Sequence, residues 1–76
     1  MAVYVVMVND RHSDPIAEVW ADEGEAIMRA RSLGAIEYGA SGTEGLSPSM
    51  RRNGWIFYCT YSVEGDAVWV VKTEVH

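Results

Sequence analysis

Side-chain types in the C-terminal third of this chain alternate from residue to residue, as they do in β-strands. This pattern restricts the folds that the chain can adopt. Two strand-like runs, Trp55 to Val63 and Ala67 to Val75, flank the turn-forming pair Gly65-Asp66. Pairing Glu64 with Ala67 predicts a hairpin with large apolar side chains on both faces. One face then carries Trp55, Phe57, Cys59, Tyr61, Val63, Val68 and Val70, and the other carries Ile56, Tyr58, Thr60, Ser62, Trp69, Val71, Thr73 and Val75. A fold that contains this hairpin must cover two apolar faces.

The N-terminal residues predict a second hairpin. Val3 to Val8 is apolar on both alternating faces, as expected of a strand in the middle of a sheet. Turn-forming residues follow from Asn9 to Pro15, and Ile16 to Ala21 is a more amphipathic strand-like run. We therefore expect two antiparallel strands at the start of the chain.

A single segment has the spacing of an amphipathic helix. Asp22 and Glu25 form a capping-box pattern at its start, and Gly34 provides a left-handed stop at its end. The apolar stripe between them consists of Ala26, Ile27, Ala30 and Leu33, and its small alanines favour close packing on a sheet. This pattern predicts a helix over Glu23 to Leu33.

The segment between this helix and the last hairpin is less regular. Ala35 to Tyr38 predicts a short strand, and Gly39 to Asn53 predicts a long loop because it holds three glycines, three serines and Pro48. A loop of that length in a small domain is expected to be functional or mobile. Residues 1–76 thus predict one α+β domain of the order ββα(β)ββ, an antiparallel sheet with one helix packed on one face.

Charge and cysteine content exclude several classes of function. Eleven acidic and six basic residues give a net charge of −5, which opposes direct binding to nucleic acid or to anionic membranes but suits a basic protein partner. Cys59 is the only cysteine, so neither an internal disulfide nor a multi-cysteine metal site can form. The apolar run Val3 to Val8 is too short for a signal sequence or a membrane span. We expect a soluble, cytoplasmic protein.

Several short patterns follow one another in the first half of the chain. They are the strand Val3-Tyr4-Val5-Val6, the turn Ser13-Asp14, the positions Ile16 and Val19, and the helix start with Asp22 and Glu25-Ala26. This order resembles short uncharacterised proteins encoded by phages and prophages, although the Gly/Ser-rich loop departs from their pattern. The resemblance implies a mobile-element origin, hence a host cytoplasm, and assigns no functional residue.

Two polar clusters are candidates for chemistry. His12 lies among Asp10, Arg11 and Asp14 in the first turn, where it is a base, a metal ligand or part of a solvated turn. The only other histidine is His76, so we expect no metal. In the stretch 47–54, Ser49, Arg51 and Arg52 either bind a phosphate, contact an acidic partner or face solvent.

Catalysis is not expected from these residues. Cys59 has no histidine near it in sequence, and its apolar strand neighbours favour a small buried side chain. The sequence contains no nucleophile–base pair, no metal-ligand set and no cofactor fingerprint. We therefore expect neither an enzyme nor a bound cofactor.

The aromatic residues point to an interface. One helix can cover one face of the last hairpin, which leaves Tyr58, Trp69 and Val71 on the other. Either the 39–53 loop covers them within the chain or they bind a protein, which can be a second copy in a homodimer. Stacking on nucleic-acid bases is disfavoured by the net negative charge.

Two functions follow from these observations. The first is a small acidic protein-binding module that uses Tyr58, Trp69 and Val71 together with Asp10 and Asp14. In its phage-encoded form it would inhibit a host nucleic-acid-targeting defence complex, as an anti-CRISPR protein does, by occluding a surface or by mimicking phosphates. The second is a binder of a small phosphorylated ligand or nucleotide that uses the 47–54 stretch.

Overall fold

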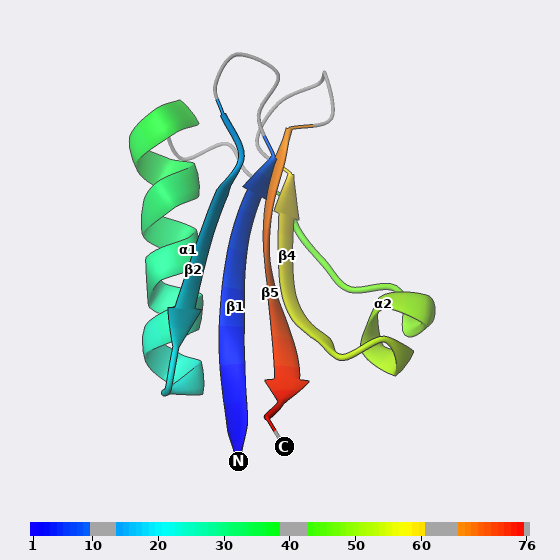
Figure 1. Ribbon diagram of the computed structural model, residues 1–76. Helices are drawn as coiled ribbons and strands as arrows, with labels where there is room; N and C mark the ends of the chain where they lie inside the picture. Colours follow the sequence, from blue (N-terminus) through cyan, green and yellow to red (C-terminus); the bar gives the residue numbers. More distant parts are fainter. Residues whose placement is uncertain (10–13, 39–42, 61–65, 76) are drawn as a thin grey trace.

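A five-stranded antiparallel sheet with one long helix against one face forms the framework of the protein (Figure 1). The computed structural model describes residues 1–9, 14–38, 43–60 and 66–75. In chain order the elements are β1 (Ala2–Asn9), β2 (Ile16–Trp20), α1 (Glu23–Tyr38), β3 (Thr43–Glu44), α2 (Pro48–Arg52), β4 (Trp55–Thr60) and β5 (Ala67–Glu74). The strands lie in the order β2-β1-β5-β4-β3, so the two hairpins meet where β1 pairs with β5. The expected α+β class is confirmed.

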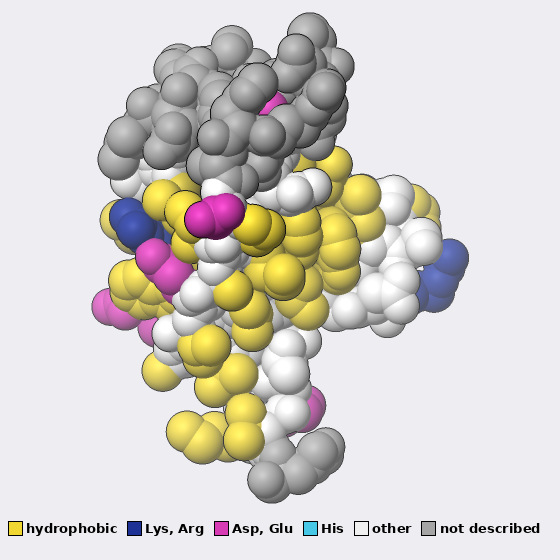
Figure 2. Space-filling view, turned by 45° about the horizontal axis from the view of Figure 1, so that its top comes forward, with side chains coloured by type: hydrophobic (Ala, Val, Ile, Leu, Met, Phe, Trp, Pro, Cys, Tyr) yellow, Lys and Arg dark blue, Asp and Glu magenta, His cyan; other side chains and the backbone are white. Residues whose placement is uncertain are grey.

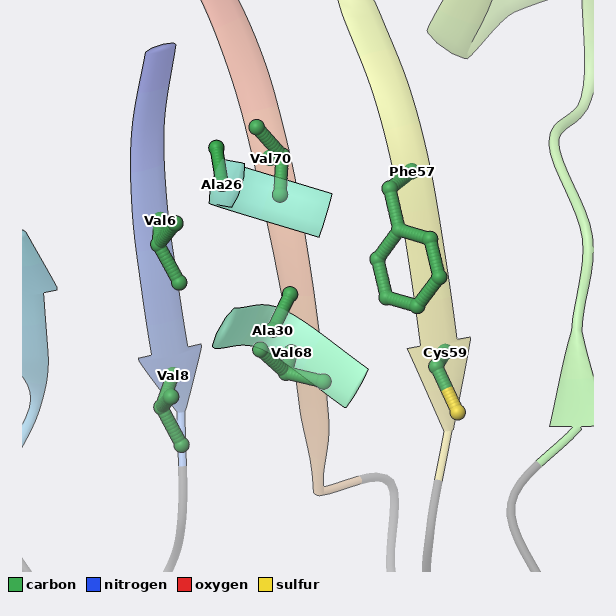
Figure 3. Packing of buried hydrophobic residues seen from close by; sticks show 8 residues of the cluster. All are labelled: Val6, Val8, Ala26, Ala30, Phe57, Cys59, Val68 and Val70. Carbon is green, nitrogen blue, oxygen red and sulfur yellow. The ribbon is translucent and has the colours of Figure 1, made fainter. Parts of the chain in front are cut away.

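The hydrophobic core lies between α1 and one face of the sheet (Figure 3). Three neighbouring strands each contribute alternate side chains to it, namely Val6 and Val8 from β1, Val68 and Val70 from β5, and Phe57 and Cys59 from β4. The helix contributes Ala26 and Ala30, both fully buried. Because these two side chains are small, α1 lies close to the central strands, as the sequence predicts.

The start of α1 is confirmed and its end is not. The backbone N–H of Glu25 donates to Asp22 Oδ2 at 2.9 Å, which satisfies one of the free donors of the first turn. The helix continues through Gly34 to Tyr38, so the predicted stop and the predicted strand Ala35 to Tyr38 are both wrong. Gly34 is buried and does not have a positive φ. Tertiary packing on its small surface therefore outweighs its poor helix propensity.

The last hairpin forms with a register different from the predicted one. Ala67 pairs with Thr60 rather than with Glu64, a difference of four residues along the strand. Since side chains alternate with period two, an even difference leaves each side chain on its predicted face. The predicted Gly65-Asp66 turn includes Gly65, which lies with residues 61–64 outside the described part of the chain.

A β-bulge interrupts this parity at the beginning of β4. Val71 pairs with Trp55 and Val70 pairs with Phe57, so Ile56 is the extra residue between them. Ile56 packs against the core, and Trp55 lies on the opposite face of the sheet. The sequence-based faces of these two residues are therefore wrong, because a bulge is not visible in an alternating pattern.

The predicted 39–53 loop contains regular structure in its described part. β3 pairs with β4, and α2 follows after Ser47, whose side chain accepts from the backbone N–H of Met50. Ser47-Pro48 is a typical helix start, with a capping hydroxyl followed by proline in the first turn, and this signal was available in the sequence. Residues 39–42 lie outside the described ranges.

In the described ranges, no helix combines the length and the apolar character that crossing a membrane requires.

Candidate functional site

The sheet face opposite α1 carries a continuous apolar surface, which we call the open face. Its side chains come from alternate positions of four strands: Val3, Val5, Met7, Ala17, Val19, Trp55, Tyr58, Trp69, Val71 and Thr73. Figure 2 shows hydrophobic side chains gathered over β1, β5 and β4 on this side of the molecule. None of these residues is buried, and the Val19 side chain is 69% exposed. The predicted partner-binding residues Tyr58, Trp69 and Val71 are brought together here.

An aromatic cluster occupies the β4–β5 half of the open face. Trp55 stacks on Trp69 with ring centroids 5.3 Å apart and an interplanar angle of 4°. Tyr58 lies beside Trp55 with ring centroids 5.7 Å apart. Neighbouring aromatic rings of this kind give a rigid, broad contact surface of the type found at interface hot spots. Trp55 is the member that the sequence analysis placed on the wrong face.

Aliphatic side chains occupy the β1–β2 half of the open face. Val5 pairs with Val71 on one side and with Val19 on the other, and Met7 pairs with Trp69. Sequence reasoning did not include these residues in the candidate site. The signal for them was present, because an early strand that is apolar on both faces must place one of those faces away from the helix.

The open face contains no charged side chain among the residues that define it. The strand acids Glu18 and Glu44 lie on the helix side, where Arg29 donates to both carboxylate oxygens of Glu18 at 2.9 Å. This hydrogen bonding by Arg29 is the main cause of the lowered pKa of Glu18. Glu44 likewise accepts two hydrogen bonds from Arg31, at 3.1 and 3.2 Å. These two pairs keep Glu18 and Glu44 away from the open face.

The helix α2 lies against β4 and does not extend over the rest of the open face. Among the described elements, α2 contacts β4 alone, and Figure 1 shows it beside the outer edge of the sheet. The helix in this loop therefore does not reach β5, which carries Trp69 and Val71, although it lies against β4, which carries Tyr58. No part of α2 contacts β1, β2 or β5, so the aliphatic half is equally free of it.

A shallow pocket of about 250 Å³ lies on the helix side, near the β3–β4 edge. Its polar lining consists of Arg31, Glu44 and Arg51, and its apolar lining includes Phe57. The Arg31 guanidinium carbon lies 5.4 Å from the centre of the Phe57 ring, within the range of a cation–π contact. Glu44 pairs with Arg31, so Arg51 is the cation of this pocket that makes no ion pair with an acid of the described residues.

The predicted phosphate-binding set is only partly assembled at this pocket. Arg51 lines it, whereas Arg52 and Ser49 do not. Both arginines are exposed, and the Ser49 carbonyl accepts from the Asn53 side chain at 3.0 Å. The sequence placed these residues in one stretch, but a short helix directs neighbouring side chains to different sides.

The remaining polar candidates provide no chemistry in the described part of the chain. Asp14 is exposed, and Asp10, Arg11 and His12 lie outside the described residues. No three His, Cys, Asp or Glu side chains in the described ranges lie close enough together to hold a metal ion. Cys59 is buried, and burial raises the pKa of its thiol, which disfavours the reactive thiolate.

No protein-family model, curated protein or solved structure matches this chain.

Proposed function

We propose that this protein is a protein-binding module and that the open face is its binding surface. The observation that carries the proposal is the Trp55–Trp69 stack, flanked by Tyr58, on an apolar face that neither helix covers. Aromatic residues at the centre of an uncharged patch are the anchors that dominate protein–protein binding energies. Monomeric soluble proteins rarely expose a contiguous apolar patch of this kind, and such patches usually mark interaction sites.

The resemblance of the first half to phage and prophage proteins suggests one setting for this activity, namely inhibition of a host defence complex. In that setting the uncharged open face supports occlusion of a partner surface by apolar contact. Phosphate mimicry would need a different surface, such as the acidic start of α1 formed by Asp22, Glu23 and Glu25. Occlusion would therefore use the open face, and phosphate mimicry would use the helix start on the other side of the sheet.

Site-specific photocrosslinking in cells that express the chain tests the proposal. A benzophenone amino acid is placed at Tyr58 on the open face, and a matched one at Met28, which is 70% exposed on α1. We expect protein adducts of defined mass from position 58 and none from position 28. Equal adducts from both positions, or no adduct from position 58, would contradict the proposal.

The pocket beside Arg51 supports a second candidate function, the binding of a small anion. Its apolar walls and Arg51, which pairs with no acid of the described residues, favour a monoanion with an apolar body over a phosphate, which needs more donors. Titration with benzoate, followed by amide chemical shifts, tests this. Arg51→Gln should abolish the shifts, while Arg52→Gln, with the same loss of charge one residue away, should leave them unchanged. Equal effects of the two variants would exclude a site at this pocket.

A further inference from the structure

We infer that the protein bound by the open face is a second copy of this chain, packed face to face about a two-fold axis. This inference rests on the proposed function and specifies its partner. It follows from three properties of the open face: the distribution of its large side chains, its area and its lack of charge.

The first property is a division into two unlike halves. The β4–β5 half is bulky, with the stacked Trp55 and Trp69, and the β1–β2 half is flatter, with Val5 and Val19. A two-fold axis that runs parallel to the strands, between β1 and β5, places the bulky half of each copy on the flat half of the other. An isologous contact of this kind makes the face complementary to itself. It is also the aligned packing that two sheets adopt when their inner faces meet.

The second property is the area of the face. Four strands at about 4.8 Å spacing and about 20 Å long give a flat footprint of roughly 400 Å² per copy, which side-chain relief increases. Two such faces give a flat footprint of about 800 Å² in total, and side-chain relief brings the buried area to about 1,000 Å², at the lower limit of specific interfaces. We expect a dissociation constant on the order of 1 to 10 µM, as in a dimer that dissociates on dilution.

The third property is the absence of charge. A chain with a net charge of −5 repels its own copies at long range. Its open face has no acid among its defining residues. Of the described strand acids, Glu18 and Glu44 lie on the helix side with arginine partners, and Glu74 lies 3.6 Å from the N-terminal amine. Among these described acids, a face-to-face dimer consequently buries no unpaired carboxylate, and the two acidic helices lie on its outer sides. Moderate salt should strengthen the dimer because it screens the remaining repulsion.

Sedimentation equilibrium on the purified protein, from about 1 µM to about 1 mM, tests the dimer. Two matched variants each add one negative charge at a well-exposed apolar residue, so neither should prevent folding. Val19→Glu lies on the open face, where the side chain is 69% exposed, and Met28→Glu lies on α1, where it is 70% exposed. We expect the wild type and Met28→Glu to reach twice the monomer mass, and Val19→Glu to dissociate at least tenfold more readily.

Three results would overturn the inference. They are a wild type that stays monomeric at the highest concentration, an equal effect of Val19→Glu and Met28→Glu, and a dimer that salt weakens. If the wild type is monomeric while position 58 crosslinks to a different protein, the second copy is excluded and the protein-binding function stands. If the protein is monomeric and position 58 gives no adduct, both proposals fail.

Discussion

Gly54 connects α2 to β4, and its replacement by alanine should destabilise the protein more than the same replacement at Gly45. Gly54 has a φ of +85°, in the left-handed region that residues with a Cβ rarely adopt. A Cβ built there would lie 3.0 Å from the backbone oxygen of Lys72. That oxygen cannot move away easily, because the Lys72 N–H donates to the Gly54 carbonyl at 2.8 Å.

The expected loss can be assembled from these contacts. The left-handed conformation costs a residue with a Cβ about 1–2 kcal/mol. Displacing Lys72 weakens a backbone hydrogen bond whose net contribution is about 1 kcal/mol. Against this, alanine restricts the unfolded chain and returns about 0.4–1 kcal/mol. We therefore expect Gly54→Ala to lower the free energy of unfolding by about 1–2.5 kcal/mol.

Chemical denaturation followed by tryptophan fluorescence measures this loss, and Gly45→Ala is the matched control. A Cβ at Gly45 meets nothing within 4 Å, and this residue does not have a positive φ. Its N–H, which donates to the Tyr58 carbonyl at 3.1 Å, is retained in alanine. We expect the control to change the stability by less than about 0.5 kcal/mol. An equal loss in the two variants, or a Gly54→Ala protein as stable as the wild type, would refute the reasoning.

Three further predictions concern single side chains. Asp22→Ala should cost about 0.5–2 kcal/mol in thermal or chemical unfolding, because the Glu25 N–H loses its acceptor, and Asp22→Asn should cost less. The folded-state pKa of Glu18 lies below its ordinary value of 4.5, so its pairing with Arg29 stabilises the protein above that pH, and this stability is lost as the pH falls through the lowered pKa. The unfolding free energies of the wild type and Glu18→Gln should accordingly converge on acidification, and a constant difference would count against the ion pair. The Cys59 thiol should react with iodoacetamide far more slowly in the native protein than in urea, and similar rates in both would show that it is accessible.

The elements that sequence reasoning located correctly are those determined by neighbouring residues. The start of α1 depends on Asp22 and Glu25, which lie three positions apart and contact each other in the first turn. The composition of the core face follows from the alternation of Phe57 with Cys59 and of Val68 with Val70, which an even change of register does not alter. The local sequence pattern is sufficient in both cases. The helix cap joins two residues that are close in sequence, and the core face repeats every second residue along a strand.

The features that sequence reasoning missed depend on contacts between distant segments. Gly34 fails to end α1 because it is buried, and burial is a property of the assembled fold. The bulge at Ile56 exists because β5 offers one residue where β4 has two, which no inspection of β4 alone reveals. The helix α2 is a different case, because the local pair Ser47-Pro48 predicts its start. The glycines and serines around this pair led to the prediction of a loop instead.

The bulge also determines which change of chain length the aromatic cluster can tolerate. Trp55 already pairs with Val71 and Phe57 with Val70, so Ile56 is a residue that the ladder itself does not use. Deleting Ile56 would therefore convert the bulge into regular ladder and leave Trp55 on the open face, where it stacks on Trp69. The loss would fall on the core, against which Ile56 packs. A diverging lineage can thus lose this residue and keep the aromatic surface.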